Sequence, residues 1–206
     1  LGDDGYEITR TSIKPYAGCY HALPAVTGLL ELVERHDMGP SGIRGIEVDT
    51  YETARRTCAT DEKWGRSMTR ETADHSLPYV VAVAALAGDL RPEHYDDDWL
   101  ESDAVHDVVD LISVDVDDAL TAARRAGEGL TPTRVRLVTG TDSFETLVER
   151  PLGHPDRPLT RAAVEAKART LVAPHLSDAQ ADRLVDQCRT LEERASVDEL
   201  VTATAA

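Results

Sequence analysis

Residues 70–88 read RETADHSLPYVVAVAALAG, and this stretch decides the fold of the chain. Ser76 is a good N-cap residue, and Pro78 suits a first helical turn because its missing N–H would have no partner there. Gly88 suits the position that follows a helix. The residues between Ser76 and Gly88 are almost all apolar, which predicts a helix that is buried on every side. We therefore expect the N-terminus of this helix to open onto the interior or onto a domain interface.

Ionisable side chains gather at the start of this helix. Arg70, Asp74 and His75 precede it, and Tyr79 lies in its first turn. Because unpaired backbone N–H groups at a helix N-terminus attract anions, these side chains suit a pocket for a carboxylate. The alternative is structural: Asp74 and Ser76 cap the helix, and His75 is a buried histidine with its hydrogen bonds satisfied. The spacing alone favours the structural alternative.

A second motif lies upstream, where residues 14–25 read KPYAGCYHALPA. Together the two motifs resemble the MmgE/PrpD family, and in particular its 2-methylcitrate dehydratase branch, which carries the signature K-P-Y-x-x-C-x-H-x-x-P-A. The motifs stand in the family's order. The resemblance covers the C-terminal portion of a longer enzyme, and the chain begins at Leu1 without a methionine, so we expect a fragment.

The resemblance implies a hydro-lyase that removes water from a citrate-type tricarboxylic acid in propionate breakdown, without a metal or other cofactor. This reaction needs cations for the carboxylates, a base for the carbon-bound proton and an acid for the departing hydroxyl. The family also implies a cytoplasmic homodimer, with its pocket between this domain and an N-terminal helical domain that is missing here. The isolated fragment is therefore expected to be inactive.

The matching positions supply the candidate site residues. Lys14 would bind a substrate carboxylate or transfer a proton, and His21 could be acid or base because an imidazole titrates near neutral pH. Arg70 could clamp a carboxylate with two hydrogen bonds, and Tyr79 could protonate the departing hydroxyl. The resemblance thus implies a catalytic set and a substrate-binding set: Lys14, His21, His75 and Tyr79 for catalysis, and Arg70, Tyr16, Asp74 and Ser76 for substrate binding.

Two other functions remain open. The first is another activity of the same superfamily, an iminodisuccinate epimerase or a cis-aconitate decarboxylase. Cys19 occupies a position where the decarboxylases carry a histidine, which argues against a decarboxylase. The second is a non-catalytic interaction domain that retained the fold.

Composition excludes several classes of protein. A net charge of −16, with 38 acidic against 22 basic residues, argues against nucleic-acid binding. No run of apolar residues is long enough to span a membrane, and no signal peptide is visible. The three cysteines have no metal-ligand spacing, which fits a reducing cytoplasm and no zinc site. Scarce lysine and abundant aspartate are typical of salt-accumulating halophiles, whose roughly 1 M salt would screen repulsion of an anionic substrate.

The hydrophobic pattern predicts an α+β fold, with a small mixed sheet, helices packed on it and an all-helical C-terminal tail. We expect an α+β domain over residues 1–152 and a helical segment over 153–206 that would pack on the missing N-terminal domain. The predicted strands are 6–16, 43–51 and 113–116, with a hairpin over 133–139 and 143–149. The predicted helices after the first motif are 23–35, 52–59, 104–112, 117–125, 161–175, 178–194 and 197–204.

Overall fold

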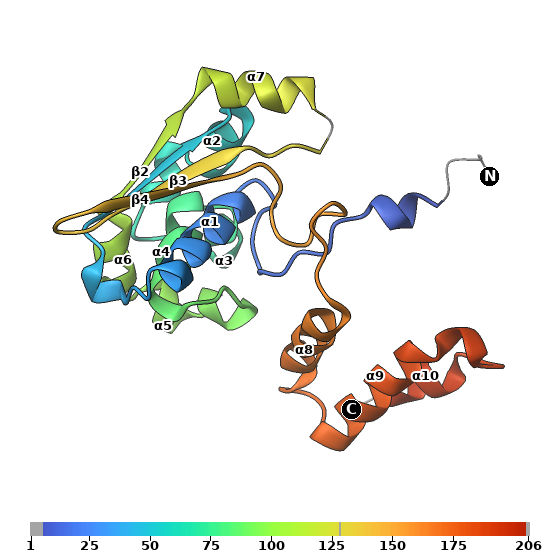
Figure 1. Cartoon of the computed structure of the whole chain (residues 1–206). Coiled ribbons are helices and arrows are strands. Elements are labelled where there is room, and N and C mark those ends of the chain that lie inside the picture. Colours follow the sequence, from blue (N-terminus) through green and yellow to red (C-terminus); the bar gives the residue numbers. More distant parts are fainter. Residues whose placement is uncertain (1–5, 128, 205–206) are drawn as a thin grey trace. The chain divides into compact units, whose positions relative to one another are not determined.

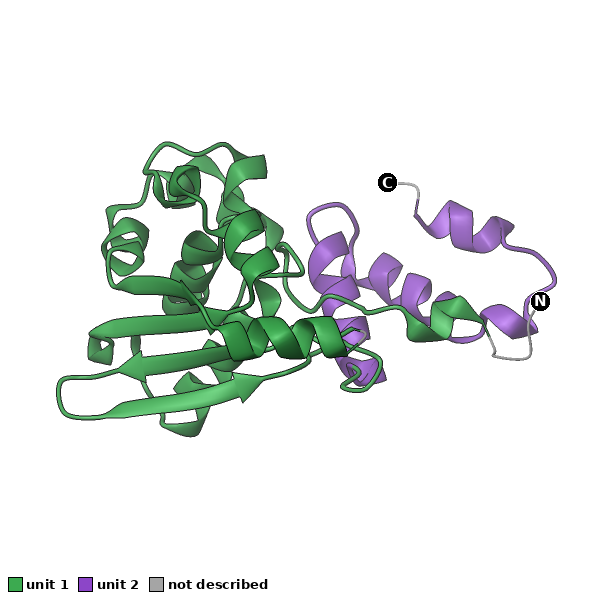
Figure 2. Ribbon diagram, turned by 90° about the horizontal axis from the view of Figure 1, so that it is seen from above, with its two compact units in different colours: residues 1–158 green, residues 159–206 purple. Residues whose placement is uncertain are grey.

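The computed structural model describes residues 6–127 and 129–204. The chain divides into two compact units, residues 1–158 and residues 159–206 (Figure 2). The first unit combines a four-stranded sheet with helices, and the second is helical (Figure 1). The α+β prediction is confirmed. No helix of the described residues is both long and apolar enough to span a membrane.

The helices have the following bounds: α1 (Leu23–Arg35), α2 (Glu52–Cys58), α3 (Arg70–Ala73), α4 (Leu77–Ala87), α5 (Asp97–Leu100), α6 (Asp103–Val109), α7 (Asp118–Ala126), α8 (Arg161–Val172), α9 (Asp178–Arg189) and α10 (Asp198–Ala203). The strands are β1 (Gly45–Thr50), β2 (Ile112–Val116), β3 (Thr133–Val138) and β4 (Ser143–Val148). Short 3-10 turns cover η1 (Glu7–Arg10), η2 (Pro40–Gly42), η3 (Asp61–Trp64), η4 (Pro92–Tyr95) and η5 (Leu191–Glu193).

The sheet has the order β2-β1-β3-β4. β1 pairs in parallel with β2 and antiparallel with β3, and β3 and β4 form the predicted antiparallel hairpin. Alternate residues of β1 and β3 are buried, as the period of a strand with one covered face requires. The sequence pattern therefore located all four strands, and the sheet is mixed as predicted.

The covered face of the sheet carries the hydrophobic core. α1 packs on β3 and β4, and α4 packs against α1, α6 and β2. α1 approaches closely because it presents Gly28 to the sheet, where a Cβ atom would lie 3.0 Å from a methyl group of Val135. Every residue of α4 from Leu77 to Ala85 is buried, which confirms that this helix is covered on all sides.

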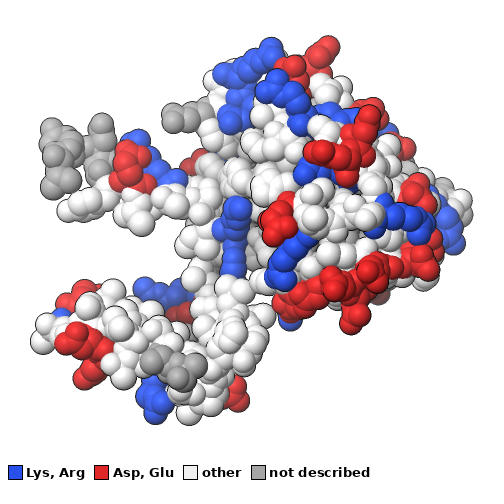
Figure 3. Space-filling model, turned by 180° about the vertical axis from the view of Figure 1, so that it is seen from behind, with Lys and Arg blue, Asp and Glu red and all other residues white. Residues whose placement is uncertain are grey.

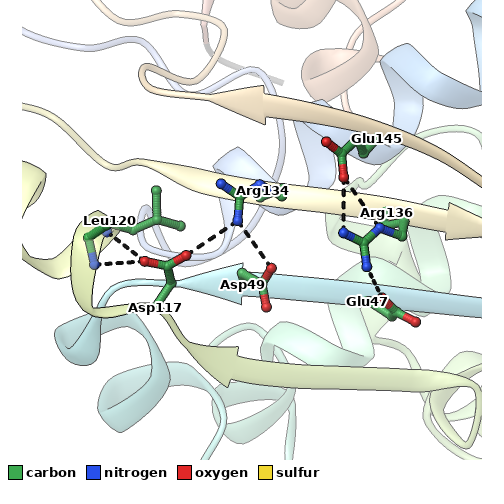
Figure 4. Close-up of polar contacts among 8 residues, drawn as sticks. Glu47, Asp49, Asp117, Leu120, Arg134, Arg136 and Glu145 are labelled. Atoms are coloured by element: carbon green, nitrogen blue, oxygen red, sulfur yellow. Dashed lines mark hydrogen bonds and ion pairs between the residues drawn. The ribbon is translucent and has the colours of Figure 1, made fainter.

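The opposite face of the sheet carries charged side chains (Figure 4). Arg136 of β3 donates to Glu47 at 2.7 Å and to Glu145 at 3.0 Å. Its neighbour on that face, Arg134, lies 3.4 Å from Asp49 and 3.3 Å from Asp117. Acidic and basic side chains also lie interspersed on the face of the larger unit seen in Figure 3. One face of the sheet is thus apolar and covered by helices, and the other face carries ion pairs.

The predicted strand over residues 6–16 is wrong. The segment contains the short turn η1 and no strand, and its apolar side chains are exposed, Tyr6 at 68% and Ile8 at 77%. It is held by single backbone bonds, such as the one from Ile13 N–H to the Gly153 carbonyl at 2.9 Å. β-prone residues form a strand only where a neighbouring strand pairs with them, and among the described residues no strand of the sheet pairs with this segment.

Smaller differences concern the ends of elements. Ile112 was predicted as the last residue of a helix and instead begins β2. α8 and α9 end at Val172 and Arg189, earlier than the predicted helices. Residues 153–158 group with the first unit, where Arg157 pairs with Glu31 of α1.

The second unit is a small set of helices joined by short loops. Thr160 caps α8 through the N–H of Ala163, and Ser177 forms a capping box with Gln180 at the start of α9. The guanidinium of Arg189 contacts both carboxylate oxygens of Glu165, which ties α9 to α8. α8 has no fully buried residue, so this unit buries little of its own apolar surface.

A glycine turn holds the segment that carries the first motif. Gly153 has a φ of +90°, and a Cβ atom there would lie 1.9 Å from the Ile13 carbonyl oxygen. We predict that Gly153→Ala lowers the free energy of unfolding by more than about 1 kcal/mol, because alanine fits neither this conformation nor this space. Chemical denaturation measures the change. Gly140→Ala is the control, since a Cβ there meets nothing within 4 Å. Equal losses in both variants would contradict the prediction.

Asp117 makes stability depend on pH. The Leu120 N–H, the Ala119 N–H and the guanidinium of Arg134 hold the pKa of this carboxyl below its usual value of 3.8. A group whose pKa is lower in the folded state stabilises the fold above its unfolded pKa, and this stabilisation is lost as pH falls through the folded pKa. We predict that Asp117→Asn is less stable than the unchanged protein at neutral pH, and that the difference closes in acid.

Urea unfolding at neutral pH and at about pH 3 measures this difference. Asp118→Asn removes the same charge one residue along and serves as the control. A difference for Asp117→Asn that keeps its full size in acid would contradict the role given to the carboxylate.

Candidate functional site

The two motifs meet through a backbone hydrogen bond. The N–H of Cys19 in the first motif donates to the carbonyl of Asp74 in the second at 2.8 Å. Gly18, the residue before Cys19, packs closely on the core, because a Cβ atom there would lie 3.2 Å from Leu90. The backbone N–H of His21 is also hydrogen-bonded to the Cys19 thiol, which places the start of the His21 turn beside it. The structure thus brings together His21 and the Asp74–His75 pair around Cys19.

His75 and Asp74 contact each other directly, although they are neighbours in sequence. Nδ1 of His75 is hydrogen-bonded to Oδ1 of Asp74. Because an ionised carboxylate only accepts hydrogen bonds, Nδ1 carries the proton and Nε2 of a neutral His75 carries a lone pair. The His75 side chain is 51% exposed, so the protein covers only about half of the imidazole. A carboxylate-oriented imidazole with an unprotonated Nε2 has the arrangement of a general base.

His21 has a different partner. Its Nδ1 lies 2.5 Å from the hydroxyl oxygen of Tyr51, and the two rings meet edge to face with centroids 5.7 Å apart. The guanidinium of Arg124 lies over the Tyr51 ring, 5.9 Å from its centroid. Burial, followed by the positive charge of Arg124, lowers the pKa of His21, while Cys19 acts in the opposite direction. His21 is therefore held mostly neutral at physiological pH.

Cys19 of the first motif forms a thiol pair with Cys58. The Cys58 side chain is hydrogen-bonded to that of Cys19, and this bond together with burial raises the pKa of Cys58. The same hydrogen bond is the main cause of the lowered pKa of Cys19, and the backbone N–H of His21 adds to it. Both cysteines are free and buried. Within the described residues, no group of three or more His, Cys, Asp and Glu side chains could hold a metal ion.

Lys14 and Tyr16 belong to the arm that leads into the first motif. The ammonium of Lys14 donates to the Gly18 carbonyl at 2.9 Å, and the side chain is exposed. Tyr16 is partly buried against the core, and burial followed by the charge of Asp89 raises its pKa. Lys14 therefore holds a positive charge over the loop that carries Cys19.

The remaining predicted site residues have contacts elsewhere. The Tyr79 hydroxyl donates to the His94 carbonyl at 2.6 Å, and the tyrosine is fully buried. Ser76 is also fully buried, and its hydroxyl caps the Tyr79 N–H and donates to the Lys63 carbonyl at 2.6 Å. Arg70 contacts Asp96 at 3.1 Å. Their contacts lie with η3, η4 and the residue after η4, and the geometry is that of groups that fix the position of α4.

Comparison with known proteins decides the family. The sequence model of the MmgE/PrpD C-terminal domain matches residues 16–191, which is most of the chain. The chain belongs to the MmgE/PrpD family. The match includes His21, Cys19 and the Asp74–His75 pair, so the site described above lies within the family domain.

Relatives in the family carry related names. An alkylcitrate dehydratase from a fungal species is 29% identical over 209 residues, which covers 90% of this chain and 40% of that protein. A second alkylcitrate dehydratase, from Talaromyces stipitatus, is 32% identical over 197 residues with the same two coverages, 90% and 40%. The 2-methylcitrate dehydratase of Cupriavidus necator is 30% identical over 151 residues, covering 69% of this chain and 30% of that protein. The chain thus spans well under half the length of these relatives.

Three residues of the site were missed by the sequence analysis. Tyr51, Cys58 and Arg124 carry no recognisable motif, and each lies far along the chain from the residue it contacts. Tyr51 lies directly after β1, and the sheet brings this end of β1 next to the first motif. The only signal in the sequence was the position of Tyr51 at the end of a predicted strand. Its partner could be identified only from the folded structure.

Tyr79 offers a direct test of a structural role. We predict that Tyr79→Phe lowers the free energy of unfolding by about 1 kcal/mol, because the hydrogen bond from its buried hydroxyl is lost. Thermal or chemical unfolding measures the change. Tyr6→Phe is the control, since Tyr6 is 68% exposed. Unchanged stability would contradict a structural role for the Tyr79 hydroxyl.

Proposed function

We propose that this chain forms part of a hydro-lyase that removes water from a citrate-type tricarboxylic acid such as 2-methylcitrate. The observation that carries the proposal is the backbone bond from Cys19 to Asp74, which joins two motifs that each carry a partnered imidazole, His75 on Asp74 and His21 on Tyr51. The names of the relatives, alkylcitrate dehydratase and 2-methylcitrate dehydratase, support the choice of substrate class.

The chemistry follows from what each group can do. Dehydration removes a proton from the carbon next to a carboxylate and expels a hydroxyl group from the neighbouring carbon. His75, oriented by Asp74, takes the carbon-bound proton at Nε2. His21 donates an N–H hydrogen bond to the departing hydroxyl, and the proton taken up by His75 balances the hydroxide released, so that one water forms overall. The ammonium of Lys14 offsets the negative charge of one substrate carboxylate, which increases as the carbon acid loses its proton.

The greater length of the relatives supports a site that is completed by sequence outside this chain. Because this chain spans only 30% to 40% of their lengths, sequence that they carry beyond the matched region is available to complete the pocket. We place the substrate between this domain and that additional part, in a cytoplasmic homodimer that acts in propionate breakdown. The chain alone is then expected to be inactive, since a three-carboxylate substrate needs more cations than Lys14 supplies.

The intact protein tests this proposal when it is offered 2-methylcitrate, cis-aconitate and iminodisuccinate in parallel. Loss of water from 2-methylcitrate is the expected result. Turnover of cis-aconitate or iminodisuccinate alone would replace the dehydratase with a decarboxylase or an epimerase. An absence of turnover and of binding for all three acids would favour a non-catalytic domain and overturn the proposal.

His75 tests the assigned base. We predict that His75→Gln lowers kcat for 2-methylcitrate by about 100-fold to 10,000-fold, because the proton acceptor is removed while a polar side chain of similar size remains. His36→Gln is the matched control, since His36 stacks on Phe144 of β4 and follows the far end of α1. A loss of less than about tenfold, equal to about 1.4 kcal/mol of barrier, would remove His75 from this role.

A further inference from the structure

Tyr51 is a buried polar side chain that contacts His21 directly. It follows β1 and immediately precedes α2, and only 1% of its surface is exposed. Its hydroxyl oxygen lies 2.5 Å from Nδ1 of His21, which is the one hydrogen-bond partner of this hydroxyl among the described residues. The guanidinium over the ring, from Arg124, contacts the face of the ring rather than the hydroxyl.

The burial of Tyr51 determines which partner donates in its hydrogen bond with His21. Burial raises the pKa of Tyr51 well above the ordinary value, so the phenol keeps its proton at any physiological pH. A buried hydroxyl that donates to nothing is costly, and solvent has almost no access to this one. The O–H therefore donates to Nδ1 of His21. An imidazole nitrogen that accepts a hydrogen bond carries no proton, so in neutral His21 the proton lies on Nε2.

We propose that Tyr51 is a positioning residue that holds His21 as the neutral tautomer with its proton on Nε2, and that His21 thereby directs an N–H donor, rather than a base, at the departing hydroxyl. This assignment rests on the proposed function for its catalytic meaning, and it settles a choice that the sequence left open. His75 is held in the opposite tautomer, because its Nδ1 donates to Asp74. One imidazole thus presents an N–H and the other presents a lone pair.

The groups that surround His21 support this state. Arg124 of α7 repels a positively charged imidazole, and Cys19 of the first motif attracts one. Protonation of Nδ1 would also force the Tyr51 hydroxyl to turn round and accept, which would leave its own hydrogen without a partner inside the protein. The carbonyl of Asp74 accepts from the Cys19 N–H, and neither Asp74 nor His75 has a hydrogen bond to His21 among the described residues. Within this set, the phenol is the one group bonded directly to the imidazole of His21.

The experiment measures the His21 tautomer from the nitrogen chemical shifts of the intact protein labelled at its histidine nitrogens. His21→Asn identifies the His21 signals. We expect Nδ1 to be unprotonated and Nε2 protonated in the unchanged protein. Tyr51→Phe keeps the ring and its edge contact with His21 but removes the hydroxyl that donates to Nδ1. We therefore expect part of the His21 population in this variant to carry its proton on Nδ1. Tyr79→Phe also deletes one buried hydroxyl and is expected to leave the His21 nitrogen signals unchanged.

Two results would overturn the proposal: a protonated Nδ1 in the unchanged protein, or the same tautomer population in Tyr51→Phe. Activity supplies an independent measurement. In Tyr51→Phe we expect kcat for 2-methylcitrate to fall about tenfold to a hundredfold with KM unchanged, as displacement of a catalytic group does. A rise in KM at unchanged kcat would contradict a positioning role. The expected nitrogen signals in a protein that turns over no polycarboxylate would refute the proposed function while the tautomer assignment stood.

Discussion

A helix with no polar side must be covered on every side, and α4 is such a helix. Its residues from Leu77 to Ala85 are all buried against α1, α6, β2 and η3. Each fully buried Val or Leu contributes about 1.5 to 3 kcal/mol relative to an exposed one, so these side chains dominate the placement of the surrounding elements. The polar groups at the start of α4 fix the orientation of the helix. Ser76 fixes its first turn, and the hydroxyl of Tyr79 ties it to η4.

The candidate site lies where the buried part of this segment ends. Ser76 is fully buried, whereas the His75 side chain just before it is 51% exposed, so the border of the core runs between two consecutive residues. The bond from the Cys19 N–H to the Asp74 carbonyl attaches the first motif to this border. His75 is consequently about half exposed, and His21 is partly buried on Tyr51. Groups in this position can be oriented by buried partners and still reach a molecule from solution.

The sequence predicted the fold better than it predicted the site. α1, α4 and the hairpin of β3 and β4 were found because periodicity, caps and turn residues are local signals. The 6–16 segment was mispredicted because β-prone residues reveal nothing about a missing neighbour. In the second motif, the residue types alone could not predict that Asp74 and His75 would be partly exposed while Ser76 and Tyr79 would be buried. Tyr51 could not be linked to His21 at all, since their contact exists only after β1 has joined the sheet.

The role of charge in this protein is local. A net charge of −16 repels a tricarboxylate at long range, but at about 0.15 M salt charges more than about 8 Å apart are largely screened. What a bound acid would experience is the nearby set: Lys14 over the first motif, Arg124 beside His21, and an Asp74 carboxylate whose charge is shared with His75. A negatively charged surface is therefore compatible with a site that binds an anion. It also follows that recognition depends on short contacts, because the electrostatic field of the whole chain opposes the approach of an anion.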